Sequence, residues 1–224
     1  MVSTVPRWLC GCALALATAS LAGCTRTTLG TVASDAEPVP HRAADLLIEP
    51  DRFPARYPAA VLDAAAVARA LQDVDGVPAA SVVNPPQCAP PPAPQDAAAV
   101  RGVDSQDASS LIVAVTRPAA PLRERAEQLA ACPSFTAVVG PATAALTVSV
   151  LPAPPVDADG SYAIDQTVTV DGSVRRTLTL AAQIDDVRVS ATLLHEGADS
   201  APDTQTLNTL FTAAVLKVHR VGGR

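Results

Sequence analysis

The stretch that decides the fold is residues 163–194, AIDQTVTVDGSVRRTLTLAAQIDDVRVSATLL. In three runs, 163–170, 174–184 and 187–193, apolar residues alternate with Thr, Ser and charged residues, which is the period of a half-buried strand. The pairs Asp-Gly and Asp-Asp separate the runs, and short polar pairs of this kind are typical of hairpin turns. The stretch therefore predicts a three-stranded antiparallel meander.

The loop lengths between these runs decide which side chains share a face of the sheet. A two-residue loop at 185–186 keeps the apolar sets of its two flanking strands on the same side. A two-residue loop at 171–172 would put the sets out of phase, whereas a three-residue loop that includes Ser173 pairs Val170 with Val174. We therefore expect the longer loop, or a bulge, at this hairpin.

Two further strands are indicated outside the meander. Residues 144–151 alternate in the same way, and residues 111–115 are apolar on both faces, which is typical of a central strand. Each of the other strands has one face rich in Thr, Ser and charge, which we interpret as a solvated face. The fold class is therefore predicted to be α+β, with an antiparallel sheet, helices packed on one of its faces, and a single domain over residues 45–224.

Three helices are predicted from their caps and periodicity. Asp63 caps the first, which runs through residue 75 and ends at Gly76. Pro121 opens the second, and Pro133 stops it. Pro202 and Asp203 open the last helix, whose apolar stripe is the clearest in the chain and consists of Leu207, Leu210, Phe211, Ala214, Val215 and Val218.

Composition and charge restrict the function classes. The 224 residues are 49% hydrophobic and 17% charged, with a formal net charge of −6, which excludes a disordered chain and a coiled coil. Removal of residues 1–23 would take away Arg7 and no acid, so the charge would fall from −6 to −7. An acidic body of this kind is not expected to bind nucleic acid.

The N-terminus reads as an export signal over residues 1–23, with Arg7 before an apolar stretch that is too short for a good membrane span. It ends in Leu21-Ala22-Gly23-Cys24, which looks like the lipobox of bacterial lipoproteins, in which the Cys carries the lipid. Residues 24–44 then read as a lipidated flexible spacer. We expect attachment to the extracytoplasmic face of the cell membrane; the alternative is an ordinary secretory signal with Cys24 a bystander.

Cys88 and Cys132 are the cysteines left once Cys10 and Cys12 leave with the signal and Cys24 takes the lipid. In an oxidising compartment they are predicted to form one disulfide, which ties a Pro-rich loop to the end of a helix. The alternatives are two separate buried thiols, or a redox or metal pair.

No residue set predicts catalysis, metal binding or a cofactor. The three histidines are not at metal-ligand spacing, and His195-Glu196 has no nucleophile motif beside it, so a hydrolase is a remote alternative. The Asp157-Ala158-Asp159-Gly160-Ser161 run fails the calcium-loop pattern and is interpreted as a polar turn. Pairs of arginines at 175–176 and at 123 and 125 read as solvated faces, although Arg123 could help to hold an anionic ligand.

The sequence resembles a group of mycobacterial lipoproteins with a sensor-like extracellular domain, similar to the external domain of PknH-type Ser/Thr kinases. The carrying residues are the lipobox, Leu46-Leu47 with Phe53-Pro54-x-x-Tyr57, Pro85-Pro86-x-Cys88, Ala131-Cys132-Pro133-Ser134-Phe135 and the C-terminal helix. The resemblance implies an α+β domain with disulfides and an apolar cleft for a ligand. The chain departs from the kinase sensor, which has two disulfides, in having cysteines for one.

The function expected from these features is a non-enzymatic, lipid-anchored binding module of the cell envelope that captures an apolar or envelope-derived small ligand. An enclosed apolar pocket with a few converging polar groups would fit this expectation. The alternative, a lipoprotein that binds a partner protein without a small ligand, would instead show an exposed apolar patch without depth.

Overall fold

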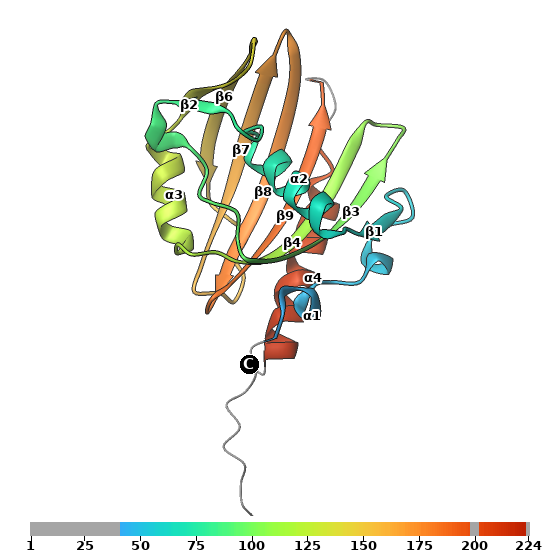
Figure 1. The fold of residues 1–224 in the computed structure, drawn as a ribbon. Coiled ribbons are helices and arrows are strands. Elements are labelled where there is room, and N and C mark those ends of the chain that lie inside the picture. The colour runs from blue at the N-terminus through green and yellow to red at the C-terminus, as the bar shows by residue number, and fades with distance from the viewer. Residues whose placement is uncertain (1–40, 198–201, 223–224) are drawn as a thin grey trace, which may run out of the picture. The chain divides into compact units, whose positions relative to one another are not determined.

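Residues 163–194 form the middle of a larger antiparallel sheet in the computed structural model, which describes residues 41–197 and 202–222 (Figure 1). In this part of the chain, nine strands run in the order β1-β3-β4-β9-β8-β7-β6-β5-β2. Their bounds are β1 Ala59–Val61, β2 Val82–Asn84, β3 Asp96–Asp104, β4 Ser109–Arg117, β5 Ser134–Val139, β6 Ala142–Leu151, β7 Gly160–Val170, β8 Ser173–Ile184 and β9 Val187–Glu196. The predicted α+β class and antiparallel sheet are confirmed.

Helices occupy both ends and the middle of the described chain. They are α1 Ala43–Leu46, α2 Ala64–Asp75, α3 Leu122–Ala130 and α4 Thr204–Gly222, with short 3-10 helices η1 Pro50–Arg52 and η2 Pro86–Cys88. The first of them, α1, begins just before the predicted start of the domain at residue 45, and it buries Ala43 and Leu46 in the core. No helix in the described ranges has the length and apolarity needed to cross a lipid bilayer.

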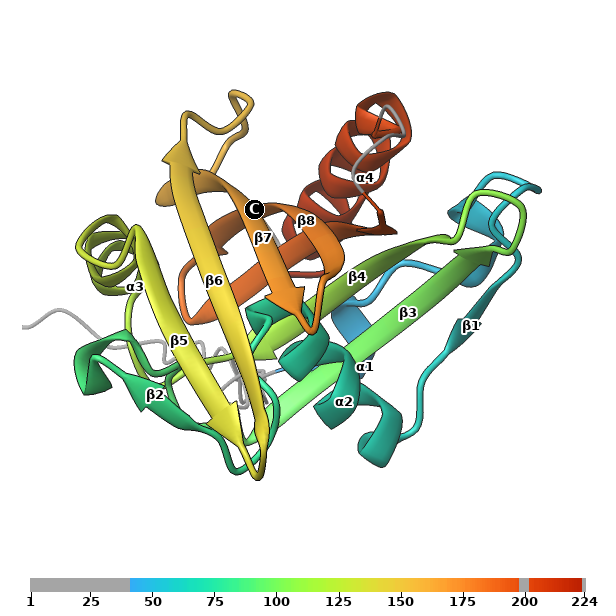
Figure 2. The same cartoon turned by 90° about the horizontal axis from the view of Figure 1, so that it is seen from above.

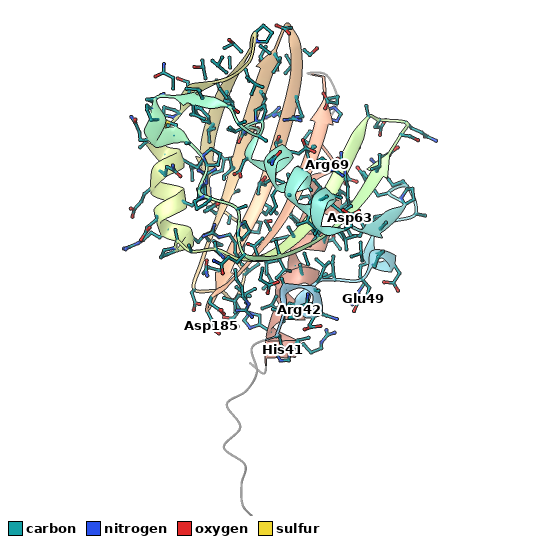
Figure 3. The ribbon with its side chains drawn as sticks, viewed as in Figure 1. His41, Arg42, Glu49, Asp63, Arg69 and Asp185 are labelled. Carbon is teal, nitrogen blue, oxygen red and sulfur yellow. A yellow bond between two sulfur atoms is a disulfide. The ribbon has the colours of Figure 1, made fainter. Side chains whose placement is uncertain are left out.

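The predicted helix caps are present. The Asp63 carboxylate accepts a hydrogen bond of 2.8 Å from the Ala66 N–H at the start of α2 (Figure 3). Gly76 ends this helix with a φ of 68°, in the left-handed region that glycine adopts without strain. The Asp203 carboxylate accepts from the Thr206 N–H at 3.1 Å, and the caps therefore fix where α2 and α4 begin.

The long helix α4 covers one face of the sheet (Figure 2). All six residues of its predicted stripe are buried, and they pack against alternate residues of β4, β8 and β9, which include Val113, Leu180 and Val189. This cluster is the largest among the described residues, and apolar side chains fill most of this face.

The opposite face is covered by α2 and α3, so the prediction that helices pack on one face is wrong. Neighbouring residues of a strand point to opposite faces, and Ile112 packs with Val67 of α2 while Val113 packs with α4. Leu122 and Leu129 of α3 pack with residues of β6 and β7 on the α2 side. The Thr and Ser residues that the sequence pattern assigned to solvent therefore lie, in large part, beneath these helices.

The two hairpins of the meander have different outcomes. Ile184 pairs with Val187 across residues 185–186, as predicted. Val170 pairs with Ser173, so the expected longer loop is wrong and the turn has two residues, Asp171 and Gly172, both with positive φ. The apolar sets of β7 and β8 are consequently out of phase, and the sheet accommodates this because both of its faces are covered.

Candidate functional site

A cavity of about 480 Å³ lies on the α2–α3 face of the sheet. Its floor is made by four neighbouring strands, β4, β9, β8 and β7, which contribute Thr116, Arg188, Ser190, Thr179, Ala181, Tyr162, Ile164 and Gln166. Short side chains such as Ser190 and Ala181 leave space above the sheet, which longer apolar residues at these positions would fill. The small side chains of the floor therefore leave room for the cavity.

The walls come from segments far apart in the sequence. Leu71, Val74 and Asp75 of α2 line one side, and Arg125 and Leu129 of α3 line another. The segment 90–94, Pro-Pro-Pro-Ala-Pro, supplies a third side. Proline has no backbone N–H, so four of these five residues expose apolar rings to the cavity without a donor that would need a partner.

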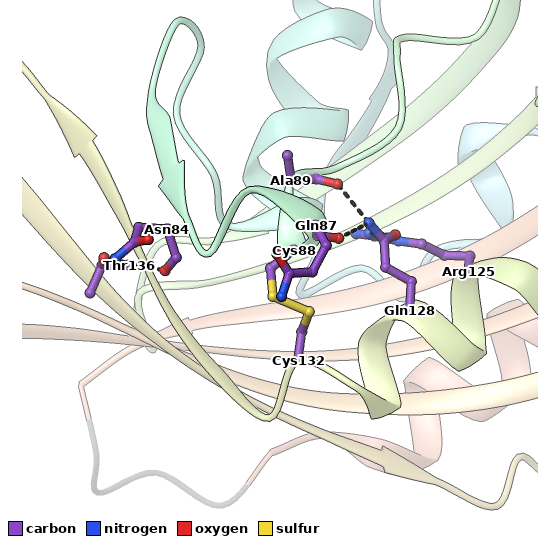
Figure 4. Close-up of a disulfide and its surroundings, with 8 residues drawn as sticks. All are labelled: Asn84, Gln87, Cys88, Ala89, Arg125, Gln128, Cys132 and Thr136. Carbon is purple, nitrogen blue, oxygen red and sulfur yellow. Dashed lines mark hydrogen bonds between the residues drawn. A yellow bond between two sulfur atoms is a disulfide. The ribbon is translucent and has the colours of Figure 1, made fainter.

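The residues just before the proline segment 90–94 are bonded to the C-terminal end of α3. A disulfide joins Cys88, two residues before Pro90, to Cys132 after the end of α3, as predicted (Figure 4). Gln128 of α3 donates two hydrogen bonds with its side-chain amide, to the carbonyl oxygens of Gln87 at 2.7 Å and Ala89 at 2.8 Å. These contacts hold two walls of the cavity at a fixed separation.

A charged link joins the α2 and α3 walls. The Arg125 Nη2 atom lies 2.9 Å from the Asp75 carboxylate, and its Nη1 atom donates to Gln128 at 2.6 Å. Gln166 of β7 donates to the Asp75 carbonyl oxygen at 3.0 Å. Gly76 packs so closely on Gln166 that a Cβ atom there would collide with its side-chain amide. The end of α2 is thus held to both α3 and the floor.

The ionisable groups of the cavity are shifted mainly by loss of water. Burial raises the pKa of Asp75, and the attraction and hydrogen bond of Arg125 offset only part of this shift. Burial also raises the pKa of Tyr162 and lowers that of Arg188. For Arg188, the nearby Tyr162 and Asp75 oppose the shift and Arg125 adds to it. Each shift disfavours charge, so the cavity is a site of low polarity.

The predicted site residues lie in different parts of the chain and do not form one site. Cys24 lies outside the described residues, as do the predicted signal at 1–23 and most of the spacer, while Cys88 and Cys132 form part of the cavity frame. Arg123 is 84% exposed and pairs with Glu127 on the same helix, away from the cavity. The neighbouring Arg125, which the sequence pattern places on a solvated face, lines the cavity instead.

Of the other sequence candidates, His195 and Asp165 line one small hollow of about 40 Å³, and Glu196 does not. His195 is buried and Glu196 is exposed, because adjacent residues of β9 point to opposite faces. Asp165 pairs with Arg176 on the strands, and the Asp159 carboxylate accepts from the Asp185 N–H at 2.7 Å. Over residues 41–197 and 202–222, no group of three His, Cys, Asp or Glu side chains is placed to hold a metal ion.

The cavity residues that sequence reasoning missed are chiefly Asp75, Tyr162 and Arg188. A signal for Arg188 and Ser190 is present in the sequence, since they alternate with the apolar residues of β9 on the face that carries Thr192. That face was interpreted as solvated. No local signal marks Asp75 or Tyr162, because the segments that enclose them come from distant parts of the chain.

Comparison with known proteins adds little to this geometry. No family model and no curated protein matches the chain. Among solved structures, it is similar to an uncharacterised protein from Mycobacterium smegmatis, an Rv0999 ortholog, with 16% identity and a TM-score of 0.43 over 72% of this chain and 86% of that one. A likeness of this degree carries no argument about function.

Proposed function

We propose that the protein is a non-enzymatic binding module of the cell envelope, tethered by lipid on Cys24 to the extracytoplasmic face of the membrane, which holds a small apolar ligand in the cavity. The tether rests on the lipobox at residues 21–24 and on the resemblance to lipoproteins with a PknH-type sensor-like domain. The ligand rests on the cavity itself.

The observation that carries the binding role is the size and chemistry of this cavity. A volume of about 480 Å³ falls in the range of small-molecule sites, and most of the lining residues are Ala, Pro, Leu, Ile or Val. A few polar groups, among them Tyr162, Gln166 and Arg188, converge on it. Apolar lining supplies affinity and the polar groups supply orientation, which is the usual division in ligand pockets.

The alternative of a partner-binding lipoprotein would use a different part of the surface. Val82 and Val138 are cross-strand neighbours on the outer strands β2 and β5, and they are 72% and 37% exposed. Such a pair can contribute to a protein contact. The cavity is the more specific feature, because a partner-binding surface does not require a hollow of this volume.

The binding role is tested with the neutral fluorescent probe N-phenyl-1-naphthylamine and the mature chain 24–224 carrying Cys24→Ser, which needs no detergent. We expect saturable fluorescence enhancement. Ser190→Phe, which fills the cavity floor, should abolish it, and so should Ala68→Trp on the α2 wall. Ser149→Phe, at an exposed position of β6 outside the cavity, should have no effect. Absence of saturable binding by the unblocked chain would reject the proposal.

The tether is tested in the cell. Full-length protein should sediment with membranes, and Cys24→Ser should release it into the soluble extracytoplasmic fraction. Unchanged fractionation of the variant would contradict the lipid assignment, and this result is independent of the probe experiment.

A further inference from the structure

The cavity carries an unbalanced positive charge. Its ionisable lining residues are Asp75, Arg125, Tyr162 and Arg188, which is one acid against two guanidinium groups with a neutral phenol. Asp75 is already paired with Arg125 at 2.9 Å. In the described ranges, no carboxylate lies within ion-pair distance of Arg188. One partly buried cation, Arg188, is therefore left without an anion.

Arg188 also has hydrogen-bonding capacity to spare. Its Nη2 atom donates to the Ala120 carbonyl oxygen at 2.8 Å, while its Nε atom is fully buried and meets no acceptor among the described residues. A buried donor without an acceptor is costly, and more so on a charged group. Burial lowers the pKa of Arg188, in line with a site that lacks its counter-charge. The planar guanidinium suits a carboxylate or phosphate, which it can bind through two parallel hydrogen bonds.

The two arginines mark one end of the cavity. A second hollow of about 210 Å³ adjoins it, and Arg125 and Arg188 line both, together with Pro91, Pro92 and Pro118. The exposed carboxylate of Glu124 lines the second hollow but not the main cavity. The apolar α2 residues Leu71 and Val74 line the main cavity alone. The Tyr162 hydroxyl is a further donor, since it makes no hydrogen bond to any described residue and its side chain lines the main cavity. Charge and apolar surface are thus segregated along the site.

We propose that the ligand of this cavity is an acidic amphipath, whose single anionic head group is bound by Arg188 with help from Tyr162, and whose apolar body lies against α2 and the proline wall. This inference rests on the proposed function, because it names the class of ligand for the same cavity. Arg125 contributes less to the head group because Asp75 neutralises it. Carboxylic acids and phosphate esters with an apolar chain both have this chemistry, which is one anionic group on an apolar body.

The inference is tested by displacement of N-phenyl-1-naphthylamine from the mature chain with dodecanoate, dodecyl phosphate and dodecanol, all below their micelle concentrations. We expect dodecanoate or dodecyl phosphate to compete at about tenfold lower concentration than dodecanol. The anion that competes at the lower concentration identifies the chemistry of the head group. Equal competition by all three, with the probe bound, would overturn this inference and leave the proposed function intact. Failure of the probe to bind would overturn both.

Two matched variants assign the effect to the head-group site. Arg188→Gln should remove the preference for the anion while dodecanol competes as before. Arg123→Gln, which changes the net charge equally at an exposed position of α3, should keep the full preference. If Arg188→Gln does not fold, Tyr162→Phe serves instead, with a reduced preference expected. Retention of the full preference in a folded Arg188→Gln or Tyr162→Phe protein would contradict the assignment.

Discussion

The two faces of the sheet are built from the same strands and yet are covered in different ways. On the α4 face, side chains such as Leu210, Phe211 and Val189 are at most 1% exposed and pack closely on the sheet. A hollow of about 440 Å³ on this side lies between α4 and residues 155–157, and no residue of the described strands lines it. On the α2–α3 face, many of the alternate residues of the same strands are Thr, Ser and Ala, and the two helices pack on the sheet at either side of a cavity. We therefore expect the α4 face to contribute more to the stability of the domain, and the difference supports the proposal that the other face holds a ligand.

The largest effect expected on the cavity face is loss of its disulfide. The double variant Cys88→Ala/Cys132→Ala should lower the free energy of unfolding by about 4 kcal/mol, because the bridge closes a loop with a sequence separation of 44. Urea unfolding followed by circular dichroism measures this change, with reduced unsubstituted protein as the matched control. An unchanged unfolding midpoint would show that the two walls of the cavity do not depend on the bridge.

A pair of leucine truncations compares the two faces directly. Leu210→Ala on α4 should lower the free energy of unfolding by about 3 kcal/mol, since the residue is 1% exposed in a closely packed core. Leu71→Ala on the cavity wall should cost about 1 kcal/mol, because part of its side chain already faces open space. It should also weaken probe binding, which Leu210→Ala should not do in folded protein. Equal losses of stability would argue against the distinction between the faces.

The close contact at the end of α2 is tested by glycine substitution. Gly76→Ala should cost about 2 kcal/mol, because it combines a positive φ with a collision against Gln166. Gly140→Ala, which also has a positive φ but no neighbour near the new Cβ, should cost about 1 kcal/mol and serves as the control for backbone strain. Thermal unfolding of the two variants separates backbone strain from the collision with Gln166. Equal losses of stability would show that the Gln166 contact contributes nothing.

The smallest effect concerns the pH dependence of anion binding. The raised pKa of Asp75 means that the folded protein holds this proton more tightly than the unfolded chain does, so protonation stabilises the fold at low pH and the gain is lost as pH rises through that pKa. The groups that face Asp75 are Arg125 on α3, Arg188 on β9 and Tyr162 on β7, with Glu124 in the adjoining hollow. Protonation of Asp75 would free Arg125 for the ligand.

Octanesulfonate, whose charge does not change with pH, should therefore bind about threefold more tightly as pH falls from neutral toward the Asp75 pKa. Competition titrations against the neutral probe measure this affinity. Asp75→Asn should bind the sulfonate with the same affinity across the range. A pH dependence that persists in this variant would have to come from another group, and would contradict the role given to Asp75.

Local patterns in the sequence were sufficient for the α4 stripe, the ends of α2 and the disulfide. The stripe from Leu207 to Val218 is fixed by helical periodicity, and the Asp63 cap and Gly76 stop delimit α2 correctly. The pairing of Cys88 with Cys132 follows from cysteine count and compartment. These features depend on residues close in sequence or on a single choice of partner.

The cavity face depends on contacts that local patterns do not encode. The tight turn at Asp171-Gly172 is the usual one for such a pair, but it was rejected because the sheet was expected to have one apolar face. Strand β3, with its Ala97-Ala98-Ala99 run, has weak strand propensity and forms because β4 and α2 cover it. Arg125 on α3 and Arg188 on β9 line the same hollow although α3 packs on β6 and β7, so no local pattern relates the two residues.

Native mass spectrometry of protein extracted from its own envelope tests the central claim most directly. The account predicts a noncovalent adduct with the mass of an acidic amphipath, retained in Arg123→Gln and lost in Ser190→Phe. Denaturation of the sample should release this adduct and leave the covalent acyl chains on Cys24, so the two lipid signals are distinguished. The protein must be extracted without a detergent that could displace the ligand. A native mass equal to that of the acylated polypeptide alone would then contradict the claim that this face of the sheet holds a ligand.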